Sequence, residues 1–414
     1  MNGLLAILIL FGVAPYAYAR QQTNADQTQL IQSLMMRIDQ LEKRVAELES
    51  PKPQNAATVT TPASLPTVSD AMQMAAQGNG TDTHPVLNMA GFSDFTFGAS
   101  DQTGSNSSFS EGQFILHFNS NLSPKVSFMG ELSLTARTDA GTGTPPAPGF
   151  NPEVERSIIR YEHNDYFKVS FGRYHTPINY WNTTFHHGQW LQTTVNRPEM
   201  VQFGGRFIPV HFVGGLIEGA TAAHGLNLNY NFGVGNGRGG VISRAGDAGD
   251  DNNSKAWLVN AFVRPDRLYG LQIGASSYRD KVTTNGRKYN EWITAAHFVL
   301  SKETPEILAE FANARHERLD TIAPVANSQA LYVQAGYRLP VLEKALKPYY
   351  RFEYIHVPVS DTLLQPISNL AGSVAGLRYD ITNFAAFKVE FRNQRRAPGQ
   401  ARINSGFIQT SFAF

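Results

Sequence analysis

Short stretches in which apolar and polar residues strictly alternate recur over most of the chain. The clearest runs from Leu226 to Val234, where every second residue is apolar and the residues between are asparagine or glycine. Only an extended strand, whose successive side chains point to opposite faces, places such a set on one side. Similar runs occupy residues 126–134, 331–339, 387–392 and 408–414. The repetition predicts an all-β protein whose strands have one apolar and one polar face.

The two faces of these strands differ in a way that favours a membrane barrel over a soluble sheet. A soluble β-sandwich also alternates, but here the polar face carries charges, as at Lys388, Glu390 and Arg392, and aromatic residues are frequent on the apolar face. In a barrel in lipid the apolar face points outward and the polar face lines water. Beyond the N-terminus, no stretch approaches the roughly 20 apolar residues that a spanning helix needs, which excludes a helical membrane bundle.

The composition limits the chemistry that the chain can perform. Its 414 residues include no cysteine, which removes disulfides, thiolate zinc sites and cysteine nucleophiles together. The formal net charge of +1 gives no basic field of the kind that nucleic-acid-binding proteins carry. No nucleic-acid partner is therefore expected.

The N-terminus has the features of an export signal. An apolar stretch from Leu4 to Ala14 is followed by Ala17, Tyr18 and Ala19, a small-x-small cleavage pattern. We predict a signal peptide over residues 1–19, although no lysine or arginine precedes the apolar stretch. The alternative is a short buried helix.

A heptad pattern follows, in which isoleucine or valine at one position and leucine three residues later repeat every seven residues. Arginine and glutamate flank these positions at the spacing of interchain ion pairs. The residues of this pattern are Ile31, Leu34, Arg37, Ile38, Leu41, Glu42, Arg44, Val45, Leu48 and Glu49. It predicts a coiled-coil oligomerisation helix over residues 29–50. The repeated Arg-apolar-x-x-apolar-Glu arrangement resembles that of short trimeric coiled coils, whereas β-branched residues paired with leucine favour a two-stranded coiled coil. A single amphipathic helix lying on the barrel or the membrane is the alternative.

Residues 51–88 are rich in proline, threonine and alanine and predict a linker. Sixteen strands are expected beyond it, with fourteen or eighteen as alternatives, and short junctions alternate with longer polar ones as in membrane barrels. The expected strands are 90–98, 112–120, 125–137, 154–163, 166–174, 205–217, 224–234, 255–264, 267–278, 289–301, 306–315, 329–339, 347–357, 372–381, 385–395 and 403–414. A barrel of this size is wide enough for an aqueous channel.

The region from residue 89 to Phe414 resembles bacterial outer-membrane porins. Phe171 to Tyr174, leading to Pro177, and Lys347 to Tyr354 are similar to segments of the phosphate-selective porin O/P-like group. The terminal Phe414 is similar to the aromatic end that the insertion machinery recognises in outer-membrane barrels. The resemblance implies a homotrimer in the outer membrane of a Gram-negative bacterium.

Residues on the polar faces are expected to line the channel, where arginine and lysine favour anions. The predicted pore-lining cations are Arg137, Arg156, Arg160, Lys168, Arg338, Arg351, Arg378, Lys388 and Arg392, with Lys125 beside them. Carboxylates share this face: Glu131, Glu162, Glu310, Glu353, Asp380 and Glu390. Cross-strand ion pairs that hold the wall together are the alternative role for these charges, for example Arg351 with Glu353, Arg378 with Asp380, and Lys388 with Glu390.

An aromatic segment from His175 to about Met200 is too long and too apolar to remain exposed to solvent. Porins commonly fold such a loop into the lumen, so the resemblance implies a constriction loop here. Its expected residues are Tyr180, Trp181, His186, His187, Trp190 and Arg197. Packing of these aromatic residues in the trimer interface or against the barrel wall is the alternative.

No catalytic site, metal site or cofactor is expected. His186 and His187 lack the spacing of the His-Glu-x-x-His zinc motif, and no helix follows the glycines between Gly233 and Gly240 to receive a phosphate. The glycines predict a flexible outer loop. The acidic stretch Asp247 to Asp251 beside it is expected to be solvated, with a divalent ion as the alternative. No Gly-x-Ser-x-Gly motif marks a hydrolase, and the chain is not expected to be an enzyme.

The expected fold class is thus an all-β transmembrane antiparallel β-barrel of about 16 strands, over residues 89–414, preceded by a short α-helical coiled coil. The expected function is passive diffusion of small hydrophilic solutes through a mildly anion-selective porin, with phosphate or carboxylates as possible solutes. The alternative is a structural barrel in outer-membrane lipid whose coiled coil tethers the envelope through peptidoglycan or a periplasmic partner.

Overall fold

The computed structural model describes residues 85–137, 149–202, 207–242, 246–247, 249–365, 367–397 and 399–414. The predicted signal peptide (1–19), coiled coil (29–50) and nearly all of the linker (51–88) lie outside these residues. The linker prediction runs slightly too far, because the first strand already begins at Leu87. No helix in the described part of the chain is long and apolar enough to cross a membrane.

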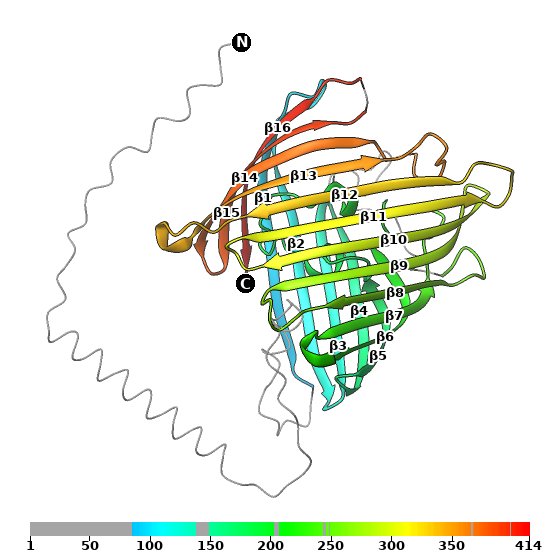
Figure 1. Ribbon diagram of the computed structural model, residues 1–414. Coiled ribbons are helices and arrows are strands. Elements are labelled where there is room, and N and C mark those ends of the chain that lie inside the picture. The colour runs from blue at the N-terminus through cyan, green and yellow to red at the C-terminus, as the bar shows by residue number, and fades with distance from the viewer. Residues whose placement is uncertain are drawn as a thin grey trace, which may run out of the picture. The chain divides into compact units, whose positions relative to one another are not determined.

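Sixteen antiparallel strands form one closed barrel, in which each strand pairs with its neighbours in sequence and β1 pairs with β16 (Figure 1). This confirms the predicted antiparallel β-barrel of about 16 strands; the coiled coil of the predicted fold class lies outside the described residues. The strands are β1 (Leu87–Ser100), β2 (Ser108–Ser123), β3 (Val126–Arg137), β4 (Gly149–Asn164), β5 (Phe167–His175), β6 (His211–Thr221), β7 (Leu228–Asn236), β8 (Ala256–Val263), β9 (Leu271–Thr284), β10 (Arg287–Ser301), β11 (Glu306–Arg318), β12 (Ala326–Gly336), β13 (Leu346–His356), β14 (Leu370–Thr382), β15 (Ala385–Arg395) and β16 (Ile403–Ala413).

Several predicted strands are shifted along the chain: the one expected at 267–278 spans Leu271–Thr284, and the one expected at 329–339 spans Ala326–Gly336. Two other shifts have a visible cause. The strand expected at 205–217 begins only at His211, because residues 207–210 belong to a segment that packs inside the barrel. The strand expected at 224–234 begins only at Leu228, because the short 3-10 turn η2 (Ala223–Gly225) precedes it. Ala223 and His224 in this turn, and Asn227 just after it, have positive φ angles, which an extended strand does not allow.

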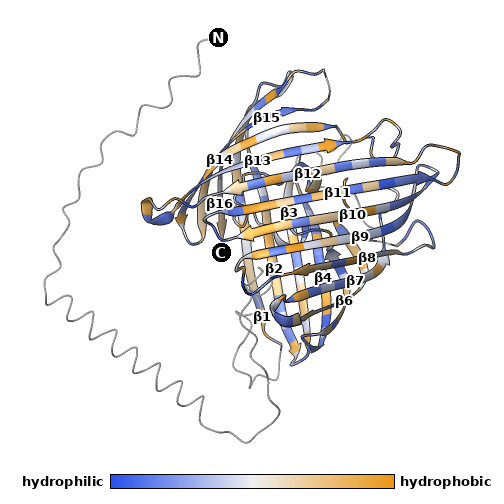
Figure 2. Cartoon of the chain, viewed as in Figure 1, coloured by the Kyte–Doolittle hydropathy of each residue, from blue (hydrophilic) through white to orange (hydrophobic). Residues whose placement is uncertain are grey.

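The alternation of the sequence becomes the two faces of the barrel wall. On β13, Tyr350, Phe352 and Tyr354 are exposed on the outside, whereas Arg351 and Glu353 between them are buried inside. Figure 2 shows the same change of hydropathy from residue to residue along the strands. An apolar outer face is stable in lipid and would be costly in water, at about 25 cal/mol for each Å² exposed.

The C-terminal residue helps to close the barrel. The backbone of Phe414 exchanges two hydrogen bonds with Gly91, at 2.7 and 3.0 Å. Its ring lies over Gly91, where a side chain on that residue would collide with it. The ring also packs beside those of Phe114 and Phe412, with centroids 5.5 and 6.3 Å away. The terminal aromatic residue therefore joins the first and last strands.

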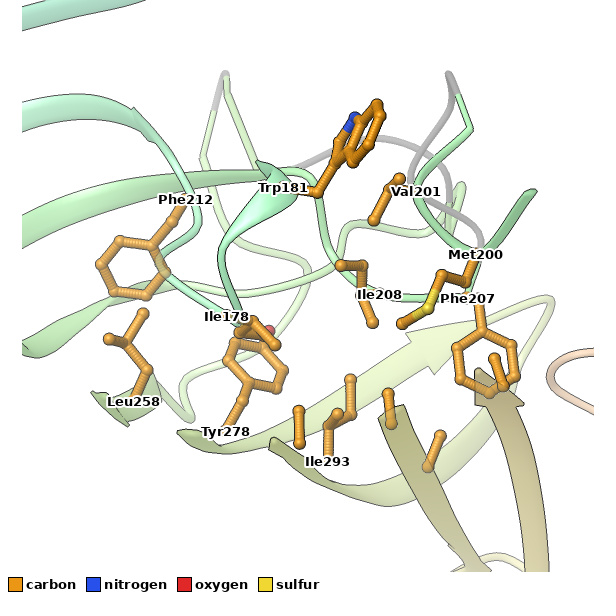
Figure 3. Packing of buried hydrophobic residues seen from close by; sticks show 14 of the residues in the cluster. Ile178, Trp181, Met200, Val201, Phe207, Ile208, Phe212, Leu258, Tyr278 and Ile293 are labelled. Carbon is orange, nitrogen blue, oxygen red and sulfur yellow. The ribbon is translucent and has the colours of Figure 1, made fainter. Parts of the chain in front are cut away.

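The connection between β5 and β6 lies inside the barrel. We call its described residues, 176–202 and 207–210, the inner loop; it contains α3 (Trp181–Thr184) and η1 (Glu199–Val201). Apolar residues of the inner loop pack against apolar inward residues of the wall, as Figure 3 shows for Ile178, Met200 and Phe207 near Tyr278 and Ile293. One side of the lumen is thus a packed hydrophobic core rather than the wholly polar lining that the alternation predicts.

Candidate functional site

Main-chain groups of the inner loop are held by charged side chains of the wall. Three cations on strands of the wall, and Arg238 after β7, bind its carbonyl groups. Arg378 donates to the carbonyls of Trp190 and Gln192, and Lys388 donates to those of Gln189 and Thr194.

Arg351 makes the third cationic contact. It donates to the carbonyls of Asn196 and Arg197, at 3.0 and 3.3 Å, and to the hydroxyl of Thr194, at 3.0 Å. The strands β13, β14 and β15 each contribute one of these cations. Buried carbonyl groups need such donors, and the wall supplies them with full positive charges.

Carboxylates of the wall accept the loop's backbone N–H groups. Glu310 on β11 accepts from Tyr180 and Trp181, at 2.8 and 2.6 Å. Glu390 on β15 accepts from Val195, and Glu353 on β13 accepts from Glu199. Because these partners lie on strands all along one half of the barrel, the inner loop extends across the lumen.

Two of these carboxylates, Glu353 and Glu390, and the nearby Asp380 form ion pairs with neighbouring cations. Arg351 lies 2.5 Å from Glu353, Arg378 lies 2.7 Å from Asp380, and Arg392 lies 2.8 Å from Glu390. The first two are the pairs expected from the sequence. The expected pair of Lys388 with Glu390 does not form in this way, because Glu390 binds Arg392 and Lys388 binds the inner loop.

The other predicted pore-lining cations lie in three different places. Arg156 forms an ion pair with Glu131, Arg160 with Glu218, and Lys168 with Glu162, all on the inner face of β3 to β6, where the three cations keep 16, 20 and 24% of their side-chain surface exposed. Arg338 follows the end of β12 and binds Glu303 and Asp380, so it lies outside the strands. Lys125 lies in the turn before β3 and is exposed. Arg137 ends β3, and its side chain is outside the described residues.

The predicted constriction residues all lie in the inner loop, against the inside of the wall. Trp181 is 1% exposed and packs edge-on against Tyr332, with ring centroids 5.8 Å apart. Tyr180 packs against Phe185, and Trp190 stacks on Phe92 at 6.3 Å. The structure therefore combines the two alternatives that the sequence leaves open, with a loop inside the lumen whose aromatic residues contact the barrel wall.

His186, His187 and Arg197 come together at one end of the inner loop. Arg197 is 2% exposed and donates to the carbonyl of His186 at 2.5 Å. Burial, together with the charge of Arg197, lowers the pKa of His186 well below its ordinary value. His186 is therefore neutral at neutral pH.

Wall residues complete this cluster, and the sequence did not single most of them out. His175 and His211 are direct cross-strand partners at the ends of β5 and β6. Glu155 and Arg156 are consecutive residues of β4 that both point inward, because the pairing with β3 shifts by one residue there. Alternation alone assigns Glu155 to the outer face. We call His175, His186, His187, His211, Glu131 and Glu155 the His/Glu cluster.

A second ionic network fixes two outer connections to the inside of the barrel. Arg238, in the connection after β7, binds Glu291 at 2.9 Å and is 2% exposed. His316 bridges Glu291, at 3.0 Å, to Asp361 in the connection after β13, at 2.8 Å. The prediction of a flexible glycine-rich outer loop is therefore wrong in part, since Gly233 and Gly235 belong to β7 and Arg238 is anchored.

Neither the known protein-family models nor the curated proteins include a match to this chain. Solved barrels with the same fold do match. OmpT, an outer-membrane protein of Vibrio cholerae, has 12% identity and a TM-score of 0.54, and the match covers 81% of this chain and 99% of OmpT. Salmonella typhi OmpF, solved with daunomycin, has 13% identity and a TM-score of 0.53, covering 79 and 97%. The outer membrane channel DcaP of Acinetobacter baumannii has 11% identity and a TM-score of 0.52, covering 81 and 99%.

These likenesses extend over nearly the whole of each solved barrel. The chain therefore has the fold of 16-stranded outer-membrane barrels, with an apolar outer face and a charged interior. At these identities the likeness is one of fold.

Proposed function

We propose that the protein is a porin-like channel of the outer membrane, through which small hydrophilic solutes diffuse passively past the inner loop. The observation that carries this proposal is the docking of the inner loop across a closed 16-stranded barrel, by the charges of β11, β13, β14 and β15. Barrels of this width leave an aqueous lumen, and a docked segment narrows it. Inward charges and an outer face of exposed apolar residues suit water inside and lipid outside.

We further propose a mild preference for anions, with phosphate or a carboxylate as the sharper form of the hypothesis. On the inner faces of β13, β14 and β15, cations outnumber carboxylates. The cations are Lys347, Arg351, Arg378, Lys388 and Arg392, and the carboxylates are Glu353, Asp380 and Glu390. The preference is mild because ion pairs cancel much of this charge and the inner faces of β9 to β11 carry carboxylates such as Glu291 and Glu306.

We also propose a homotrimer. Two observations support it: the heptads over residues 29–50, and a trimer form of OmpT among the solved barrels of this fold. The coiled coil would then hold three barrels together from outside the membrane, with residues 51–88 as the connection.

Single-channel recording in a planar bilayer tests the channel, using refolded protein and a salt gradient. Current steps in groups of three, with a reversal potential on the anion side, are the expected result. A barrel that is folded, judged by its heat-modifiable electrophoretic mobility, but does not conduct would refute a diffusion channel. That result would favour the alternative function, a structural barrel that tethers the envelope.

Deletion of residues 20–88 separates the two functions. A diffusion channel keeps its unit conductance after the deletion, because the barrel loses only the first two residues of β1, Leu87 and Asn88, and retains the inner loop. If the protein is instead a tether, the deletion removes its function, and cells that carry it should lose envelope integrity.

A further inference from the structure

The His/Glu cluster has the ligand composition of a transition-metal site. The structure contains two sets of side chains whose ligand atoms lie within 4.8 Å of one another: Glu155, His175, His186 and His211, and Glu131, His175 and His187. All of these residues except His211 are buried. Imidazole nitrogens and carboxylate oxygens are the ligands that zinc takes when no thiolate is available.

The rings of the cluster are spaced as ligands of one ion would be. The centroid of His175 lies 4.1 Å from that of His186, 5.4 Å from that of His187 and 5.6 Å from that of His211. Two imidazoles bound tetrahedrally to zinc, with Zn–N distances of about 2.0 Å, have centroids roughly 5 Å apart. The backbone register produces this spacing, since His175 and His211 face each other across β5 and β6.

Polar atoms in the cluster are left without aligned hydrogen bonds. Nε2 of His175, Nε2 of His211 and Oε2 of Glu155 are buried and make no hydrogen bond of normal geometry. Nε2 of His211 lies only 2.8 Å from Oε2 of Glu155, yet the two groups are not aligned as donor and acceptor. These atoms are held by ion-pair contacts instead, at 3.5 Å between Nε2 of His175 and Oε2 of Glu131 and at 3.2 Å between Nε2 of His187 and Oε2 of Glu155, and a bound cation would give them a common partner.

An outer layer of contacts orients one of the rings for metal binding. Nδ1 of His187 lies 3.1 Å from Oε1 of Gln113, and the amide nitrogen of Gln113 donates to Thr135 at 3.1 Å. The amide oxygen can only accept, so Nδ1 of His187 donates to it, and Nε2 of the same ring faces the cluster, 3.2 Å from Oε2 of Glu155. Histidines that bind metals typically donate their other ring N–H in this way.

Arg173 sets a condition on His211. Its guanidinium lies 3.0 Å from Nδ1 of His211 and can only donate, so coordination by Nε2 of that ring requires Arg173 to move away. Glu153 and Asp247, at 2.9 and 3.1 Å from Arg173, provide partners for the displaced side chain. His175 and His187 need no such change.

We propose that the His/Glu cluster binds one divalent transition-metal ion, for which Zn²⁺ fits best, with His175 as the ligand that both sets share. One ion is expected because both sets use His175 and one ring nitrogen binds one ion. The ion fastens the inner loop either through His186 to β4, β5 and β6 or through His187 to β3 and β5. This proposal replaces the expectation, drawn from sequence spacing, that the chain has no metal site.

Metal content of the purified protein tests the site directly and does not depend on whether the channel conducts. The full chain, produced without a polyhistidine tag, is refolded in detergent, stripped with a chelator and titrated with zinc sulfate. We expect one zinc per chain that survives dialysis, and an X-ray absorption spectrum with nitrogen and oxygen neighbours at about 2.0–2.2 Å. Loss of all zinc on dialysis of folded wild-type protein would overturn the proposal.

Three variants give the residue-level test. His175→Gln should lower zinc affinity by more than the roughly 10- to 100-fold that changes in outer contacts cause. His187→Gln should lose zinc if the ion lies in the set with Glu131. His297→Gln is the matched control, because His297 is buried on β10 and binds Gln272 away from the cluster. Equal zinc binding by His175→Gln and His297→Gln would refute the assignment, and heat-modifiable mobility verifies that each variant is folded.

Discussion

Replacing Arg351 by alanine tests whether buried charges of the wall hold the inner loop in place. The side chain of Arg351 is fully buried, and that of its ion-pair partner Glu353 is only 3% exposed. The change removes three hydrogen bonds to Thr194, Asn196 and Arg197 and leaves the Glu353 carboxylate buried without this partner. Breaking a buried pair from one side costs about 3–5 kcal/mol.

Because the lost contacts join the wall to the loop, most of this cost should appear as easier undocking of the loop. At about 1.4 kcal/mol for each factor of ten, the undocked population rises between roughly 100-fold and several thousand-fold. Amide hydrogen exchange measures that population, since an amide exchanges only when its local structure opens. The amides of Val195 and Glu199 report it, because Glu390 and Glu353 bind them in the docked state.

Arg396→Ala is the matched control for this experiment. Arg396 also binds the inner loop, at Glu199, but its side chain is 36% exposed. An exposed ion pair contributes about 0.2–1 kcal/mol, so exchange in this variant should rise no more than about fivefold. If Arg351→Ala and Arg396→Ala increased exchange equally, the reasoning that buried charges of the wall hold the loop would be refuted.

Three further predictions concern other parts of the barrel. Trp181→Ala should lower stability by about 3–5 kcal/mol, because Trp181 fills the apolar core between the inner loop and Tyr332; a lower thermal midpoint in detergent checks this, and an unchanged midpoint would contradict it. At Asp361, burial raises the pKa, but hydrogen bonds from His316 and Ser328 outweigh burial and hold the pKa below its usual 3.8. The carboxylate therefore stabilises the folded protein above pH 3.8, and this stabilisation is lost as the pH falls through the lower, folded-state pKa. Asp361→Asn should thus make the thermal midpoint fall less steeply as the pH is lowered into the acid range. An unchanged fall would count against this role. Phe414→Ala removes the ring contacts with Phe114 and Phe412, each worth about 0.5–1.5 kcal/mol, and should reduce the yield of heat-modifiable barrel after refolding into lipid vesicles; wild-type yield would argue against a role in closure.

The strands and their two faces could be predicted from the sequence because apolar and polar residues alternate along almost every strand. On β13 and β15, the alternation places Arg351, Glu353, Lys388 and Glu390 inward, as the structure does. The prediction fails where the period breaks. At Glu155 an extra residue in β4 turns two neighbouring side chains to the same side, and nothing in the local sequence marks the position of that shift.

The partners of the inward charges could not be predicted in the same way. Alternation tells which face a residue occupies, but it does not reveal its partner. The acceptors of Arg378 are the carbonyl groups of Trp190 and Gln192, which are more than 180 positions away in the sequence. The His/Glu cluster also depends on contacts between residues that are distant in the sequence. His175 and His211 are far apart in the sequence and meet only because β5 and β6 pair in one particular register.

The contacts that dock the inner loop have a consequence for how such a channel can diversify. Arg351, Arg378 and Lys388 bind carbonyl oxygens of residues 189–197, and Glu353 and Glu390 bind backbone N–H groups, so these contacts are made to main-chain atoms that every amino acid except proline provides in full. Side chains at positions such as Gln189 and Asn196 can then be exchanged while the path of the loop is conserved. Evolution, or an engineer, could alter the side chains that the inner loop presents to the lumen without changing the wall residues that hold it.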